Sequence, residues 1–209
     1  SAERGNGVTR LLKALRHGAP RLAQTRVRLG VPEEGPPLAF AMKTIHNGQG
    51  GKLTLARVLR GVFSEGDTVV SSRAGEARIA GIVDLKGQGQ SRRATAGEGD
   101  TVAFARLDNV ATSDAFASGK ERPAAIVSVA PPDPVFSLAL VVRDRKDDVR
   151  LTTALAKIVE EDPSLVLEQR PDLGEMRLCG QGEMHLRVAM ARLASRFGVT
   201  VDVRKPQIA

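Results

Sequence analysis

The 209 residues include 42% hydrophobic and 26% charged side chains, the balance of an ordinary globular protein with room for one large domain or two small ones. Aromatic residues make up only 3%, without Trp or Tyr, so the cores must be aliphatic and few rings are available to stack bases. One cysteine excludes an internal disulfide, and the sequence has no apolar run long enough to cross a membrane. We also expect no signal peptide. We therefore expect a cytoplasmic protein with no membrane partner.

The formal net charge of +7 is concentrated near the N-terminus. Residues 1–30 contain seven Lys or Arg and one acid, whereas the rest of the chain is almost neutral. Such a segment could contact phosphate, or it could be a basic helix separated from an acidic neighbour. Because the remainder is nearly neutral, we expect no DNA partner.

The first predicted element is a short amphipathic helix. Its apolar residues recur at helical spacing: Val8, Leu11, Leu12 and Leu15. Asn6 is the candidate start signal, and Gly18 with Pro20 ends the pattern. A lone helix of about ten residues is marginal in water, so this helix must dock on something. Residues 31–37, with three prolines and a glycine, then predict a linker.

Short strand patterns separated by glycine turns follow from residue 38 to about 129, typical of a β-sandwich or closed barrel. The predicted strands are 38–44, 52–59, 68–71, 77–84, 101–107 and 124–129. No helical periodicity interrupts them. We assign residues 1–35 to the helix and linker and residues 36–130 to an all-β barrel domain.

A proline-rich boundary at 131–134 introduces a different pattern. The predicted order is strand 135–142, helix 149–161, strands 165–168 and 175–179, a helix within 182–197, and a final strand with Val199, Val201 and Val203. The order βαββαβ is that of a ferredoxin-like fold. We therefore predict an α+β domain at 131–209, joined to the barrel by a linker that permits relative motion.

The sequence has no phosphate-binding loop of the type G-x-x-x-x-G-K-[ST]. The nearest candidate, residues 48–52, runs into a strand pattern, so we interpret it as a hairpin turn. His17, His46 and His185 lie on separate elements, so we predict no metal site and no cofactor in this chain. Glu183 and His185 would not converge on one helix as an acid–base pair, and we expect His185 at the surface and Glu183 at the helix N-terminus.

Two charged runs are candidates for contacts with a partner. Glu160, Glu161 and Asp162 are consecutive at a helix end, so they cannot face one another across a substrate. We interpret them as a solvated cluster or a docking point for a basic partner. Arg92 and Arg93 are expected in a polar loop, where they either contact phosphate or are simply exposed. Neither run predicts catalysis.

Three longer runs resemble elongation factor G and its paralogues: Gly51-Lys52-Leu53-Thr54-Leu55-Ala56-Arg57-Val58, Leu155-Ala156-Lys157-Ile158-Val159-Glu160-Glu161-Asp162-Pro163-Ser164, and Gly180-Gln181-Gly182-Glu183-Met184-His185-Leu186. The first is similar to the opening of the family's barrel domain II, and the others to helices of its domain III. The resemblance covers about residues 36–209, and residues 6–20 resemble the closing helix of the family's GTP-binding domain. Met184 and Arg187 depart from the usual pattern, which indicates an elongation-factor-G-like paralogue.

The resemblance implies that this chain is a non-catalytic piece of a translational GTPase. The parent would bind GTP and magnesium in a domain that this chain lacks and act during elongation on the ribosome. The barrel would contact small-subunit RNA and protein, and the third domain would relay nucleotide state between the GTP-binding domain and the C-terminal domains. We predict ribosomal RNA contacts at four cations: Lys52, Arg57, Arg92 and Arg93. We predict an interdomain relay at five residues: Glu160, Glu161, Asp162, Glu183 and His185.

Two alternatives stay open. The chain could be a stand-alone RNA-binding module, although its strands lack the exposed aromatics that stack bases in RNA-recognition sheets. It could also be a fragment of a ribosomal protection or peptide-release GTPase, because these share the barrel and the third domain. A small enzyme with a site between the domains has no convergent titratable residues to support it.

Overall fold

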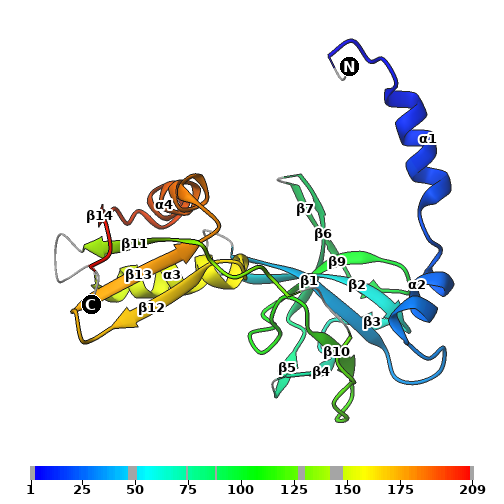
Figure 1. The fold of residues 1–209 in the computed structure, drawn as a ribbon. Helices are drawn as coiled ribbons and strands as arrows, with labels where there is room; N and C mark the ends of the chain where they lie inside the picture. Colours follow the sequence, from blue (N-terminus) through cyan, green and yellow to red (C-terminus); the bar gives the residue numbers. More distant parts are fainter. Residues whose placement is uncertain are drawn as a thin grey trace.

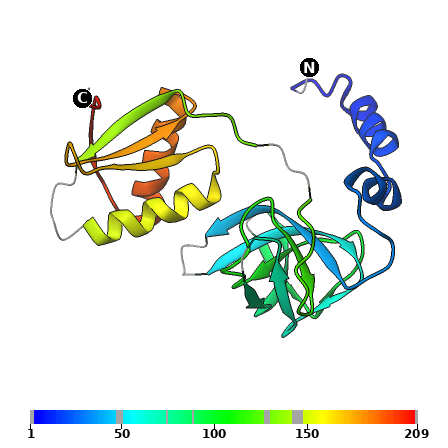
Figure 2. The same cartoon turned by 60° about the horizontal axis from the view of Figure 1, so that its bottom comes forward.

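The computed structural model describes residues 3–46, 51–73, 75–87, 89–126, 130–141 and 148–207. Two helices precede a β-domain, and residues 130–135 lead from it into a smaller α/β domain (Figures 1 and 2). The predicted fold class, an all-β domain followed by a ferredoxin-like α+β domain, is confirmed. Within the described ranges, no helix is both long enough and apolar enough to cross a membrane.

Helix α1 (Val8–Gly18) begins where the apolar spacing predicts, and its N-cap residue is Gly7, at φ 84, rather than Asn6. None of its residues is buried, and it extends away from the β-domain (Figure 1). The predicted apolar face is 38–60% exposed. In this structure, therefore, the apolar face of α1 lies open to solvent.

Helix α2 (Leu22–Leu29) is not predicted by the sequence, because its apolar residues are too few to show a clear period. The Gln24 side chain accepts the Arg21 backbone N–H at 2.9 Å and helps to start the helix. Arg26 then fastens α2 to the barrel: its Nε donates to the Leu59 carbonyl at 2.5 Å, and its guanidinium pairs with Glu98 at 2.5 Å. Tertiary contacts thus stabilise this short helix.

The predicted linker at 31–37 contains no helix or strand, but it is held in place. The buried guanidinium of Arg60 donates to the backbone carbonyls of Pro32, Glu34 and Pro36 at 2.7–2.8 Å. Gly35, at φ 130, lies so close that a Cβ there would meet the Arg60 guanidinium at 2.7 Å. Linker and barrel therefore form one unit.

The β-domain consists of β1 (Leu38–His46), β2 (Lys52–Arg60), β3 (Phe63–Ser64), β4 (Thr68–Ser71), β5 (Glu76–Arg78), β6 (Gly81–Lys86), β7 (Gly89–Arg93), β8 (Thr95–Ala96), β9 (Thr101–Ala105) and β10 (Ala115–Ser118). Its main sheet is antiparallel, in the order β5-β4-β10-β1-β2-β9-β6-β7, and β3 pairs with β8. Only Ile79 and Ala80 separate β5 from β6, although these strands lie near opposite ends of the order. The sheet is therefore curled into a barrel.

The barrel encloses an aliphatic core with three fully buried rings, Phe63, Phe104 and Phe116. Their centroids lie 5.4–5.7 Å apart in edge-to-face and tilted arrangements, which aromatic pairs prefer. Three of the six phenylalanines in the chain therefore lie in this one core.

Several strand predictions need correction. The predicted strand 77–84 is interrupted at Ile79 and Ala80, and no strand forms at 124–126, while 127–129 lie outside the described residues. Strands β3, β7, β8 and β10 carry too few alternating apolar residues to be recognised from sequence. Arg92 and Arg93 were expected in a loop, but they lie in β7, an edge strand whose polar side chains show no apolar alternation.

The second domain consists of β11 (Phe136–Val141), α3 (Asp148–Glu161), β12 (Val166–Arg170), β13 (Glu175–Gly180), α4 (Glu183–Phe197) and β14 (Asp202–Arg204). The antiparallel sheet has the order β12-β13-β11-β14, as the ferredoxin-like fold requires. Leu151 and Leu155 of α3 share one buried cluster with Leu186 of α4 and Leu178 of β13. Both helices therefore pack on the same face of the sheet.

Candidate functional site

The two domains meet where β1 and α3 end. Glu161, in the last turn of α3, accepts the backbone N–H of His46, the last residue of β1, at 2.6 Å. Only 6% of Glu161 and 9% of His46 are exposed. A buried carboxylate needs strong partners, so this contact is held by further charges from both domains.

Arg196 of α4 supplies the main partner of Glu161. Its two terminal nitrogens donate to the two Glu161 carboxylate oxygens at 2.7 and 2.9 Å, the bidentate geometry in which Arg–carboxylate pairs are strongest. Arg196 also donates to the backbone carbonyl of His46. The Glu161–Arg196 pair therefore binds both backbone polar groups of His46.

Glu160 makes the second half of the contact. One of its carboxylate oxygens lies 2.5 Å from Lys52 Nζ, and the other lies 2.6 Å from His46 Nε2. His46 and Lys52 are cross-strand partners on β1 and β2, which places their side chains together. Lys52 Nζ also donates to the Asp108 carbonyl at 3.0 Å. We call the five residues His46, Lys52, Glu160, Glu161 and Arg196 the junction cluster.

The environment of Glu161 keeps it ionised. Burial by itself raises its pKa, but the hydrogen bonds from Arg196 and from the His46 N–H outweigh burial and leave the pKa below its usual 4.5. Pairing with Glu161 in turn raises the pKa of Arg196. Because the pKa of Glu161 is lowered in the folded state, the contact stabilises the junction above pH 4.5 and is lost as the pH falls through the lowered value.

Asp162 and His185, also predicted relay residues, form a pair inside the α/β domain. Asp162 Oδ2 lies 3.1 Å from His185 Nε2, and His185 Nδ1 accepts the Gln181 N–H at 3.1 Å. A neutral His185 therefore carries its proton on Nε2 and donates it to Asp162. His185 was expected at the surface, but its side chain is 23% exposed, because the turn after α3 packs against the start of α4.

Glu183 lies apart from the other four relay candidates. It is exposed and pairs with Arg187 at 2.8 Å along the same helix. The structure thus places Glu160 and Glu161 at the junction and Asp162 with His185 beside the end of α3. The relay role of all five stays a prediction.

The four predicted RNA-contacting cations do not form one patch. Lys52 is buried in the junction cluster. Arg57 donates to Thr101 Oγ1 at 3.0 Å, and Arg93 pairs with Asp84 at 3.3 Å and Asp100 at 2.7 Å. Arg92 is exposed on the edge strand β7. Their contact with RNA stays a prediction, and the burial of Lys52 makes it the least accessible of them.

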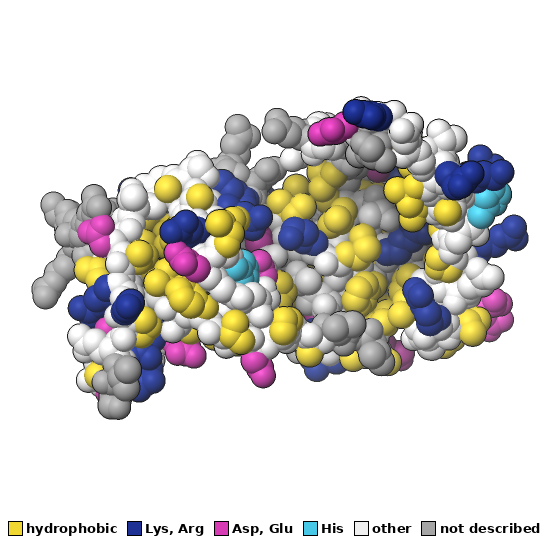
Figure 3. Space-filling view, turned by 45° about the horizontal axis from the view of Figure 1, so that its top comes forward, with side chains coloured by type: hydrophobic (Ala, Val, Ile, Leu, Met, Phe, Trp, Pro, Cys, Tyr) yellow, Lys and Arg dark blue, Asp and Glu magenta, His cyan; other side chains and the backbone are white. Residues whose placement is uncertain are grey.

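Exposed cations gather instead at the end of the molecule formed by α1, as Figure 3 shows. The basic residues on this helix are Arg10, Lys13, Arg16 and His17. All of them are exposed, and they belong to the basic segment 1–30 identified in the sequence.

Sequence reasoning missed two members of the junction cluster, His46 and Arg196. His46 was noted only as one of three scattered histidines. Arg196 stands in a helix among other arginines, and no local pattern marks it as the partner of a carboxylate 35 residues away.

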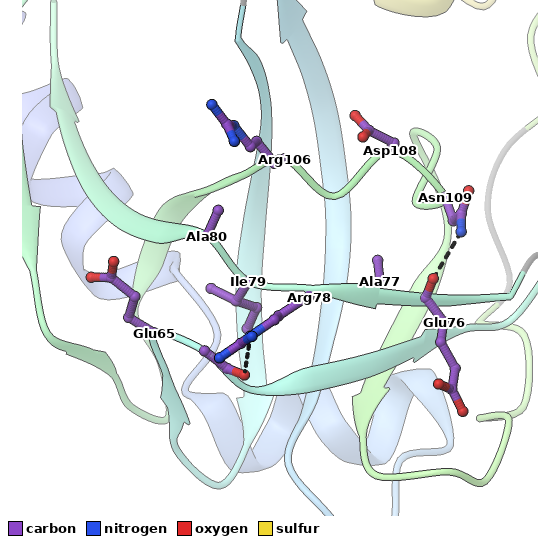
Figure 4. A pocket seen from close by; sticks show the side chains of 10 residues that line it. Glu65, Glu76, Ala77, Arg78, Ile79, Ala80, Arg106, Asp108 and Asn109 are labelled. Atoms are coloured by element: carbon purple, nitrogen blue, oxygen red, sulfur yellow. Dashed lines mark hydrogen bonds between the residues drawn. The ribbon is translucent and has the colours of Figure 1, made fainter.

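A hollow of about 770 Å³ lies on the barrel beside β5. It is lined by Glu65, Gly66, Glu76, Ala77, Arg78, Ile79, Ala80, Arg106, Asp108 and Asn109. Asn109 donates to the Glu76 carbonyl at 2.8 Å and Arg78 to the Gly66 carbonyl at 3.1 Å, which are structural roles. In Figure 4 the carboxylates of Glu65, Glu76 and Asp108 point in different directions, so they do not converge on a substrate.

The two expectations about cofactors concern a metal ion and the glycine run before Lys52. No group of three or more His, Cys, Asp or Glu residues there could hold a metal ion. Residues 48–50 of the glycine run lie outside the described residues. Lys52, which follows that run, lies in a strand and pairs with Glu160, so it is not placed as a phosphate-binding lysine at a helix start.

Comparison with known proteins places this architecture in a class. Residues 131–205 match the family model described as Elongation Factor G, domain III. The chain is 39% identical over 210 residues to an elongation factor G-like protein of Synechocystis sp., which covers all of this chain and 30% of that protein. It is 33% identical over 186 residues to an elongation factor G-like protein of Thermotoga maritima, covering 88% of this chain and 27% of that protein.

A crystal structure of a Thermus thermophilus protein superposes with a TM-score of 0.78 at 31% identity, covering 97% of this chain and 30% of that one. The fold and these matches define a two-domain segment of a translation elongation factor. The chain belongs to the elongation factor G family. It spans about 30% of the length of the relatives that match all or nearly all of it.

Proposed function

We propose that this chain is the part of a ribosome-dependent GTPase that docks on the small ribosomal subunit and transmits nucleotide state between domains. The whole protein would bind GTP and magnesium outside this chain and work in the cytoplasm during elongation. This chain itself would carry no catalytic residue. The family relationship over the whole chain supports the ribosomal setting.

The junction cluster is the single observation that carries the transmitting role. It joins the last turn of α3 and one residue of α4 directly to the ends of β1 and β2. A displacement of either helix therefore acts on the barrel through charged groups rather than through the connecting chain alone. Charged contacts of this kind can exchange partners between two domain arrangements.

Co-sedimentation of the 209-residue chain with isolated small subunits, at low and at near-physiological salt, tests the docking role. We expect saturable binding that survives the higher salt. Arg92→Glu should weaken binding and reduce the salt slope by about one phosphate contact. Lys120→Glu, another exposed barrel cation beyond β10, is the matched control.

Binding that vanishes at the higher salt, or that falls equally in both variants, would contradict a specific docking surface on the barrel. A stand-alone RNA-binding function has less support. The cross-strand register places Ser137, Ala139 and Arg177 on the sheet face opposite the helices, together with Cys179. None of these offers an aromatic ring for base stacking.

A further inference from the structure

The junction cluster contains two contacts of different kinds. The Glu161–Arg196 pair binds the backbone N–H and C=O of His46, whereas Glu160 binds the side chains of His46 and Lys52. A backbone contact is indifferent to which residue occupies position 46, but it requires one orientation of the strand end. A side-chain contact between flexible groups tolerates small rotations.

We propose that Arg196 is the positioning residue that sets the angle between the two domains, acting through the main chain of His46, and that Glu160 with Lys52 holds the closed arrangement reversibly. The inference rests on the proposed transmitting function for its significance. Its test needs no ribosome, so it stands or falls separately from ribosome binding.

The surroundings of Arg196 fit a fixed side chain. Its guanidinium lies 5.6 Å from the Phe197 ring centroid, on which Lys157 Nζ also lies at 5.9 Å. Its side chain is 31% exposed, while that of its partner Glu161 is 7% exposed. The planar guanidinium can bind the carboxylate with two nitrogens and still reach the His46 carbonyl, which a lysine ammonium cannot do with the same geometry.

The remaining members of the junction cluster, His46, Lys52 and Glu160, complete the set of charged and polar groups around the junction. Glu160 faces Lys52 and His46, and no described carboxylate other than Glu160 and Glu161 pairs with these cations. Two carboxylates thus face Lys52, Arg196 and the His46 imidazole. Opening the junction would break the contacts of Glu160 with Lys52 and His46 and those of the Glu161–Arg196 pair with the His46 backbone, so these contacts favour the closed arrangement.

Distances between two spin labels, measured on the 209-residue chain, test the proposal. Labels are placed at Lys120→Cys in the barrel and Arg192→Cys on α4, in a Cys179→Ala background that removes the native thiol. We expect one narrow distance distribution for the parent. Arg196→Lys should add a displaced population, raising its share about tenfold or more.

A charge swap separates the backbone contact from simple charge pairing. Glu161→Arg combined with Arg196→Glu restores an ion pair, but Arg196→Glu leaves no donor at that position for the His46 carbonyl. We expect the double variant to stay displaced. A return to the narrow parental distribution would overturn the role of the His46 main chain.

Lys52→Met probes the same junction from the barrel side, where a folding defect in the α/β domain cannot interfere. It should broaden the distribution of spin-label distances in the closed arrangement without moving its centre, because the Glu161–Arg196 pair remains. Glu183→Gln, which breaks an exposed ion pair within α4, is the matched control and should leave the distribution unchanged. An unchanged distribution in Arg196→Lys, or equal shifts in Glu183→Gln, would overturn the proposal.

Discussion

The interior of the barrel and the junction between the domains are stabilised by opposite means. The barrel interior is apolar and built around three edge-to-face rings, with Phe63, Phe104 and Phe116 fully buried. The junction consists of charged groups, of which Lys52 and Glu161 are almost as deeply buried. Apolar packing loses most of its free energy when the groups separate by a small distance, whereas ion pairs can exchange partners or water. The comparison indicates a permanent interior and a reversible junction.

The largest expected effect comes from opening the barrel interior. Phe104→Ala removes a ring that contacts both other phenylalanines and should lower the free energy of unfolding of the barrel by about 3–5 kcal/mol. Hydrogen exchange followed by mass spectrometry should show lost protection in 38–118 and unchanged protection in 148–204. Phe104→Leu, which keeps most of the volume, should cost about 1 kcal/mol. Equal loss of protection in both domains would mean that they unfold as one unit.

Breaking the junction should have a smaller and local effect. Arg196→Lys removes the bidentate pairing with Glu161. It should weaken the junction by about 2 kcal/mol, because a hydrogen bond between charged groups is lost and solvent screens the partly exposed Arg196. The His46 amide, which donates to Glu161, should then exchange about 30-fold faster by NMR. Amides of β9 in the barrel interior serve as the internal control and should not change.

Acid should weaken the junction but not the barrel interior, without any mutation. Because the pKa of Glu161 is lowered in the folded state, its contribution is present above the ordinary pKa of 4.5 and is lost as the pH falls through the lowered value. The displaced population in the spin-label experiment should therefore rise below pH 4.5, while the barrel core keeps its protection. Glu161→Gln should start displaced and respond less to pH. A parental junction that is indifferent to acid would contradict the ionic description.

The smallest expected effect belongs to the exposed pair Glu183–Arg187. Both side chains are more than 60% exposed, so solvent screens their attraction. Glu183→Gln should change the free energy of unfolding of the α/β domain by no more than about 0.5 kcal/mol in urea titration. A loss comparable with that of Arg196→Lys would show that Glu183 belongs to the relay after all, as the sequence suggested.

Predictability differs between the domains for a physical reason. In the α/β domain, helical periodicity marks α3 and α4 to within a residue, because each helix buries one stripe of Leu and Ala. In the barrel, β10 forms from Ala115–Ser118, small residues with weak strand preference that become central only through pairing with β1 and β4. The edge strand β7 is polar throughout, so its pairing with β6 leaves no mark in the apolar pattern.

The candidate site divides in the same way. The acidic run at Glu160 and Glu161 is visible in the sequence as a possible docking point for a basic partner. Nothing local shows that the partner is within the same chain, because His46 lies 115 residues before Glu161. Likewise Lys52, predicted from the sequence to contact ribosomal RNA, is buried where β1, β2 and α3 meet.

By itself the sequence determined the order of elements in the α/β domain, the division into a β-domain and an α/β domain, the relationship to elongation factor G and the positions of the charged runs. Periodicity and turn residues encode which face of a segment is apolar, and that information is local. Only the tertiary structure decided which charges meet, which of them are buried and which main-chain groups they bind. Those outcomes depend on contacts between residues far apart in the chain, and no local pattern records them.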